Sequence, residues 1–165
     1  MNNPAVRSGF RIKDIPVAHP PKHKEHIPWV NGSPSIEDTG TGDILCYEAW
    51  GARWFFASEE WVRKSVKEFC ENYEDMCKRA AEDPAHQYAD VANFNDLYRE
   101  LGISESTLGD AWGYSTSEDY AVDLEFNMEY VYPTENELAD RFGCRIFVIE
   151  VKDPSCYPDF YYREY

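Results

Sequence analysis

The stretch of sequence that decides the fold is NFNDLYRELGISESTLGDAWGYSTSEDYAVDLEFNMEYVY, residues 93–132. Its first part carries the signals of a helix. The side chain of Asn93 can accept a hydrogen bond from an orphan backbone N–H, and Asp96 favours the positive end of the same helix. An apolar stripe follows at a spacing of three and four, formed by Phe94, Leu97, Tyr98 and Leu101. Because Gly102 adopts a left-handed conformation at little cost, the pattern predicts a helix that begins at Asn93 and ends before Gly102.

The last part of the stretch alternates between two kinds of side chain. Large apolar residues stand at every second position from Tyr120 to Tyr132, apart from smaller Val122, and Asp123 and Glu125 lie between them. This period of two predicts a half-buried strand. Since burial of a large apolar side chain contributes roughly 1.5 to 3 kcal/mol, we expect the apolar face of the strand to anchor the core. A shift of one residue would bury the carboxylates instead, which defines the register.

The flanking segments predict further strands and helices around this centre. Residues 43–57 indicate a hairpin with its turn near Gly51, and residues 144–151 indicate a central strand because they are almost continuously apolar. A long amphipathic helix is expected from Ser58 to about Ala81, and a short helix over residues 135–142. Residues 103–119 predict a structured connector.

The predicted fold class is therefore α+β. We expect a small antiparallel sheet of about four strands, packed by one long amphipathic helix and one or two shorter helices. Residues 42–165 would form this single domain, with an aromatic C-terminal tail interrupted by Pro154 and Pro158. Residues 1–41 contain six prolines and no sustained hydropathy period, so they predict an extended arm that packs on the domain or on a neighbouring copy.

Charge is unevenly distributed along the chain. The formal net charge is −15 at pH 7, yet residues 1–30 carry +3. Residues 82–140 carry −14, with fifteen carboxylates and one basic residue, Arg99. A field of this sign repels nucleic acid and attracts basic surfaces. Two interpretations stay open: an acidic face that keeps the protein soluble, or a surface for a basic protein partner.

The familiar signatures of catalysis and of metal or cofactor binding are not in the sequence. It holds no P-loop, G-x-G-x-x-G, H-E-x-x-H or G-x-S-x-G pattern. His19, His23 and His26 are close in sequence, but Pro20 and Pro21 oppose the helix that would bring them to one metal. We therefore expect no catalytic residues, no metal and no cofactor. An unrecognised hydrolase with scattered carboxylates would need a pocket of perturbed acids.

The cellular setting is predicted from the cysteines and from hydropathy. Five cysteines are scattered without C-x-x-C spacing, and an odd number suits reduced thiols better than a disulfide framework. No apolar run approaches the roughly 18 residues of a membrane span, and no signal peptide is recognisable. We expect a cytoplasmic protein, in a bacterial host.

Several segments together resemble an uncharacterised family of proteins. They are GDILCYEAWGARWFFASEEWVRKSVKEF at residues 42–69, FNDLYRELGI at 94–103, LGDAWGYS at 108–115, DLEF at 123–126 and GCRIFVIE at 143–150. This series, over residues 42–152, resembles the soluble C-terminal part of domain-of-unknown-function family 6353 of gut Firmicutes and their phages. Many members carry a membrane segment before this part, where this chain has its proline-rich arm. The resemblance implies a fold and a phage context, but no catalytic residue.

These observations lead to a functional hypothesis. We expect a non-enzymatic acidic accessory protein of phage or prophage type that binds and inhibits a host macromolecule, such as a nucleic-acid-binding defence nuclease, in the manner of an anti-CRISPR protein. The partner would be a protein with a basic surface, without direct contact to nucleic acid or membrane. The candidate partner-binding residues are Asp110, Trp112, Glu118, Asp119, Asp123, Glu125, Glu129, Tyr161 and Tyr162. The alternative is a phage structural or assembly protein that forms homo-oligomers through its arm.

Overall fold

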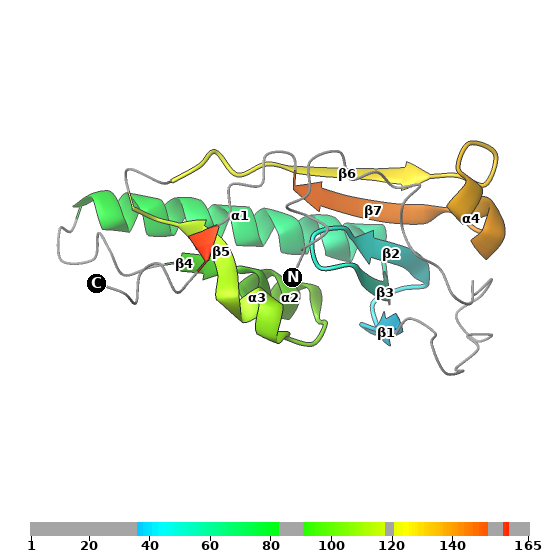
Figure 1. Cartoon of the computed structure of the whole chain (residues 1–165), viewed down its shortest axis with the longest axis horizontal. Coiled ribbons are helices and arrows are strands. Elements are labelled where there is room, and N and C mark those ends of the chain that lie inside the picture. Colours follow the sequence, from blue (N-terminus) through cyan, green and yellow to red (C-terminus); the bar gives the residue numbers. More distant parts are fainter. Residues whose placement is uncertain (1–35, 83–90, 118–120, 152–156, 159–165) are drawn as a thin grey trace. The chain divides into compact units, whose positions relative to one another are not determined.

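The structure, a computed structural model, describes residues 36–82, 91–117, 121–151 and 157–158 (Figure 1). The chain forms two compact units, which we describe separately. Unit 1 comprises Met1–Val62 and Phe126–Lys152, and unit 2 comprises Arg63–Glu125 and Asp153–Tyr165. The fold is α+β, as predicted. The expected arm over residues 1–41 lies mostly outside the described residues, and the single domain expected over residues 42–165 stays a prediction.

Unit 1 is built on a five-stranded sheet with the order β1-β3-β2-β7-β6. The strands are β1 (Ile36–Asp38), β2 (Ile44–Glu48), β3 (Arg53–Ala57), β6 (Phe126–Val131) and β7 (Ile146–Val151). The β2–β3 and β6–β7 pairs are antiparallel, whereas the β1–β3 and β2–β7 pairs are parallel. The prediction of a four-stranded antiparallel sheet was therefore wrong in both number and direction. β1 is too short to show a period, and the long connection between β2 and β7 leaves their relative direction open.

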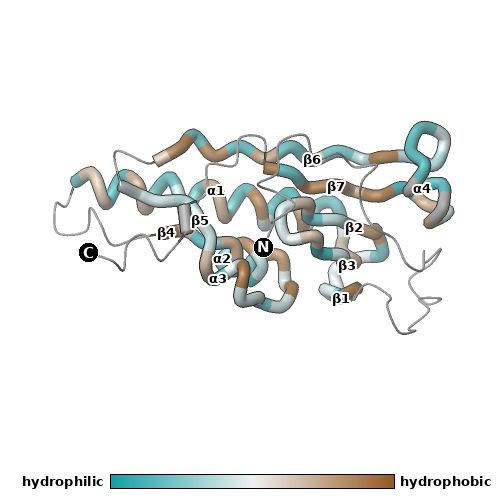
Figure 2. The backbone as a smooth tube through the Cα atoms, in the orientation of Figure 1, coloured by the Kyte–Doolittle hydropathy of each residue, from teal (hydrophilic) through white to brown (hydrophobic). Residues whose placement is uncertain are grey.

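One core cluster of unit 1 lies on one face of this sheet, and the opposite face is buried at Cys46, Phe55, Phe147 and Ile149. Trp54 is central, with its ring 4.5 Å from that of Tyr47 and 4.9 Å from that of Phe142. The buried cluster consists of Ile36, Leu45, Tyr47, Ala49, Trp54, Phe56, Val131, Ala139, Phe142, Ile146 and Val148. Figure 2 shows hydrophobic colours along β7, the central strand expected from its apolar sequence.

β6 departs from its predicted role. The expected strand ran from Tyr120 to Tyr132, but β6 begins at Phe126 and residues 121–125 are not in a strand. The face with Phe126 and Met128 was expected to anchor the core, yet these side chains are only half-buried. The physical reason is position: among the described strands β6 is at the edge of the sheet, so it has one neighbouring strand to pack against.

The β2–β3 hairpin closes through a buried carboxylate. Both oxygens of Glu48 accept hydrogen bonds, from the backbone N–H of Trp50 at 2.6 Å and of Gly51 at 3.0 Å. Ala52 takes a left-handed φ of 55° at the end of this turn. The hairpin was expected with its turn near Gly51, and this prediction is confirmed.

The long helix and the short helix after β6 both form close to their predicted bounds. α1 (Glu59–Glu82) follows Ser58, whose Oγ accepts a hydrogen bond from the Trp61 N–H at 3.1 Å. In unit 1, α4 (Glu137–Phe142) begins after Asn136 and ends at Gly143, and its first residue lies two positions after the expected start.

Unit 2 joins most of α1 to a small sheet and two helices. Its strands β4 (Val91–Asn93), β5 (Trp112–Ser115) and β8 (Tyr157–Pro158) form an antiparallel sheet with the order β4-β5-β8. The helices are α2 (Phe94–Leu101) and α3 (Thr107–Ala111). Around α2 the local prediction holds: Asn93 and Asp96 form a reciprocal capping box, and Gly102 ends the helix with a φ of 84°.

Candidate partner-binding surface

A tyrosine on α1 holds the acidic segment of unit 2 in place. Tyr73 is buried, and its hydroxyl donates a hydrogen bond to the carbonyl oxygen of Ser115 at 2.8 Å. The same hydroxyl accepts a hydrogen bond from the backbone N–H of Val122 at 3.0 Å. One side chain therefore ties together the end of β5 and the segment that leads to Asp123 and Glu125. The sequence pattern assigned Tyr73 only to the apolar stripe of the helix.

The predicted binding residues of unit 2 that the structure describes reach solvent. Asp110 on α3 and both Asp123 and Glu125 before β6 are exposed, and Trp112 at the start of β5 is half-buried. No ion pair links the three carboxylates to a basic side chain of the described residues. Unit 1 contributes Glu129, which is exposed on β6. Glu118, Asp119, Tyr161 and Tyr162 lie outside the described residues.

Three carboxylates on α1 and α2 differ from these residues because they have basic partners. Glu74 pairs with Lys78 at 3.3 Å, and Asp75 pairs with Arg79 at 2.8 Å. Arg99 contacts Asp96 and also Glu105, the latter at 2.9 Å. Lysine and arginine therefore offset part of the acid on α1 and α2. Glu71 and Glu82 of α1 are exposed without an ion pair among the described residues, as are Asp110, Asp123 and Glu125.

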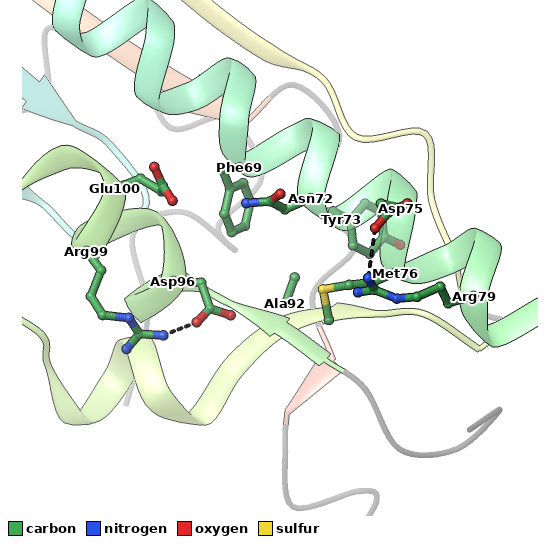
Figure 3. Close-up of a pocket in the computed structure, with 10 residues that line it drawn as sticks. All are labelled: Phe69, Asn72, Tyr73, Asp75, Met76, Arg79, Ala92, Asp96, Arg99 and Glu100. Carbon is green, nitrogen blue, oxygen red and sulfur yellow. Dashed lines mark hydrogen bonds and ion pairs between the residues drawn. The ribbon is translucent and has the colours of Figure 1, made fainter. Parts of the chain in front are cut away.

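A groove of about 490 Å³ runs between α1 and α2 in unit 2 (Figure 3). Its apolar lining comes from Phe69, Met76 and Ala92, and its polar lining includes Glu100. Figure 3 shows Arg79 directed to Asp75 and Arg99 directed to Asp96, so both guanidinium groups at the groove are already paired.

One carboxylate at this groove is perturbed. Partial burial, and then the hydrogen bond and charge of Glu68, raise the pKa of Glu100 above its ordinary value. The hydrolase hypothesis required a pocket of perturbed acids. Glu100 is one such acid, hydrogen-bonded to Glu68, and the hydrolase hypothesis stays a prediction.

Unit 1 carries an aromatic cluster on the face of the sheet opposite Trp54 and its cluster. The Tyr130 hydroxyl donates to Glu59 Oε1 at 2.7 Å, and the Arg145 guanidinium lies 4.2 Å from the centre of the Tyr130 ring. Burial and the hydrogen bond to Glu59 raise the pKa of Tyr130 to about 12. Tyr132, which is 42% exposed, lies beside it with a ring separation of 6.0 Å. Tyrosine and arginine in such an arrangement are the side chains that often dominate binding energy.

The described cysteines are free thiols, as the sequence predicts for this part of the chain. Cys46, Cys70, Cys77 and Cys144 form no disulfide. Burial raises the pKa of Cys46 to about 12 and that of Cys70 to about 11, so the nucleophilic thiolate is disfavoured at both.

Within the described ranges, no group of three or more His, Cys, Asp or Glu side chains is arranged to hold a metal ion. The cluster of His19, His23 and His26 lies outside these ranges. No helix in the part of the chain that the structure describes is long and apolar enough to cross a membrane.

Comparison with known proteins gives no further guide. No protein-family model, no curated protein and no solved structure matches this chain. The resemblance to the domain-of-unknown-function family, and the phage context that it implies, therefore stay predictions.

Proposed function

We propose that this protein acts by binding a protein partner with a basic surface, and that it inhibits that partner by occupying the surface that would otherwise contact nucleic acid. A phage or prophage accessory protein directed against a host defence nuclease is the form of this role that we favour. The proposal assigns the energy of recognition to carboxylates and aromatics, with no chemical step.

The observation that carries the proposal is the division of the carboxylates of unit 2 into two classes. Glu74, Asp75 and Asp96 on the helices are paired with lysine or arginine. Asp110, Asp123 and Glu125 are exposed and have no basic partner among the described residues. Unpaired charges of one sign steer the approach of a partner of the opposite sign. The hydrogen bonds of Tyr73 support the proposal because they hold Val122, and so the segment with two of these acids, before binding.

The test compares two variants with the same loss of charge. The first variant replaces the unpaired acids, Asp123→Asn with Glu125→Gln. The second replaces acids of α1 that are paired, Glu74→Gln with Asp75→Asn. Each protein is used to capture partners from a bacterial lysate at low and high salt, and the affinity for the recovered partner is then measured by calorimetry across a salt series.

We expect the first variant to lose affinity and to show a weaker dependence on salt, while the second behaves as the unmodified chain does. An equal response of both variants would assign the effect to net charge alone. An affinity that neither variant changes would refute the proposal.

Assembly is the second candidate function, and the outer edge of β6, which no strand of the described residues covers, favours it. In this role the chain would bind copies of itself or other particle proteins. Capture of particle proteins alone, in amounts that salt does not reduce, would favour assembly over inhibition.

A further inference from the structure

The outer side of β6 is a strand edge that no strand among the described residues covers. β6 is last in the order β1-β3-β2-β7-β6, and β7 pairs with its inner side along all six residues from Phe126 to Val131. The edge at the other end of the sheet, β1, has three residues. A strand edge of this length presents a row of backbone N–H and C=O groups that a further strand can bind.

We propose that β6 pairs antiparallel with β6 of a second copy of this chain, with Met128 of one copy opposite the partner's Met128. The contact is two-fold symmetric, so the same strand serves on both sides. It would join the two five-stranded sheets of unit 1 into one continuous sheet. This inference goes beyond the proposed binding of a basic partner and does not depend on it.

The faces of β6 restrict which register a two-fold axis can produce. Side chains alternate along the strand: Tyr130 contacts Phe147 on one face, and Val131 belongs to the core cluster on the other. Directly opposed residues of two antiparallel strands share a face, so the axis must pass through a residue and not between two. An axis at Met128 places Phe126 opposite the partner's Tyr130.

The same axis also matches the polar face of β6. It places Asn127 opposite the partner's Glu129, where an amide N–H can donate to a carboxylate. By symmetry this pair and the aromatic pair each occur twice. Aromatic pairs and hydrogen-bonded polar pairs are the cross-strand contacts that stabilise antiparallel strands.

Other positions of the axis are less favourable. An axis at Glu129 would place two carboxylates directly opposite each other, which is destabilising. Axes at Asn127 or Tyr130 would overlap the two β6 strands over only half of their length. The register centred on Met128 is therefore the one that combines overlap with complementary side chains.

Net charge gives this contact a characteristic dependence on salt. Two copies that each carry −15 repel one another, and salt screens that repulsion over a Debye length of roughly 8 Å at physiological ionic strength. The dimer should therefore strengthen as salt is added. Binding to a basic partner should weaken with salt, so the two inferences can fail independently.

The experiment is sedimentation equilibrium of the full chain over a wide concentration range, with reductant present to keep the cysteines as thiols. Four proteins form a double-mutant cycle: the unmodified chain, Asn127→Lys, Glu129→Lys, and the double variant. Asn127 lies directly opposite Glu150 on β7, and Glu129 is exposed, so lysine is compatible with the fold at both positions.

We expect Asn127→Lys to tighten the dimer by roughly fivefold to tenfold, because each copy gains a charge pair with the partner's Glu129. Glu129→Lys should change the affinity by less than about threefold, since the amide of Asn127 can also accept from lysine. In the double variant the two introduced lysines lie opposite each other across the contact. The double variant should therefore dimerise more weakly than Asn127→Lys alone, although its net negative charge is smaller and the two copies repel each other less.

Thr134→Lys, at an exposed position after β6, is the matched control for a change of charge. Thr134→Lys should strengthen the dimer only by the amount that follows from the smaller repulsion between the net negative charges of the two copies. A chain that stays monomeric at every concentration and salt would overturn the proposal. So would a dimer whose affinity rises steadily with each added lysine, because net charge and not the register would then explain the series.

Discussion

Removal of the Tyr73 hydroxyl tests how the acidic segment of unit 2 is held. In Tyr73→Phe, the carbonyl of Ser115 loses its donor and the N–H of Val122 loses its acceptor. A buried group left without its hydrogen bond costs about 1 to 3 kcal/mol, and a group that water can reach costs less. Since the Ser115 contact is buried and the Val122 contact is partly buried, we expect a total loss of about 2 kcal/mol in the free energy of unfolding.

Two measurements check this value and its location. Urea unfolding gives the change in the free energy of unfolding, and native-state hydrogen exchange reports the amide of Val122 directly. Tyr132→Phe is the matched control, because the same atom is removed from an exposed ring. We expect the control to change the free energy of unfolding by less than about 0.5 kcal/mol.

The refuting result is equally specific. If Tyr73→Phe unfolds with an unchanged free energy and the Val122 amide exchanges as before, the hydroxyl does not hold this segment. Partner binding provides a further check, because Tyr73→Phe alters no charge. Under the proposed function its affinity should fall through the added freedom of Asp123 and Glu125, while the salt dependence stays the same.

Three further predictions concern stability. Ala52→Gly should raise the free energy of unfolding by about 0.5 to 1 kcal/mol in urea, because glycine adopts the left-handed φ of 55° without strain. Gly109→Ala should lower it by about 2 kcal/mol, since the added Cβ would lie 2.4 Å from Asn95 Oδ1 and disturb its hydrogen bond from Ser106; an unchanged melting curve would contradict this. Burial, and then Glu129, raise the pKa of Glu150 above 4.5, so its contribution to stability is present at low pH and is lost as pH rises through the raised pKa. Glu150→Gln should therefore flatten the dependence of stability on pH in that window, as thermal unfolding at a series of pH values would show.

The parts of the fold that the sequence predicts correctly are those with local causes. Asn93, Asp96 and Gly102 act within one helix, so their capping roles can be recognised without knowledge of the rest of the chain. The hairpin of β2 and β3 is local in the same way. The apolar sequence of β7 likewise indicates a buried strand wherever it pairs.

Errors arose where distant pairing decides the outcome. The alternation before β6 is a genuine period of two, but whether such a face is buried depends on how many neighbours the strand has. Gly109 shows the same limit: it is recognisable as a turn residue, yet its close approach to Asn95 appears only in three dimensions. For the candidate site, Asp110, Asp123 and Glu125 are exposed, and their role in partner binding stays a prediction. The pairing of other acids and the role of Tyr73 depend on tertiary contacts that spacing does not reveal.

The order of the strands in unit 1 has a consequence for how the protein is made. β2 and β3 leave the ribosome before β7, which can pair with β2 only after residues 58–151 have been synthesised. Until then the apolar side chains of β2 and β3 lack the strand that completes their sheet. At roughly 5 to 20 residues per second, this interval lasts several seconds or more. During translation unit 1 is therefore incomplete and open to aggregation and to chaperones for this interval, although its N-terminal half is made before unit 2.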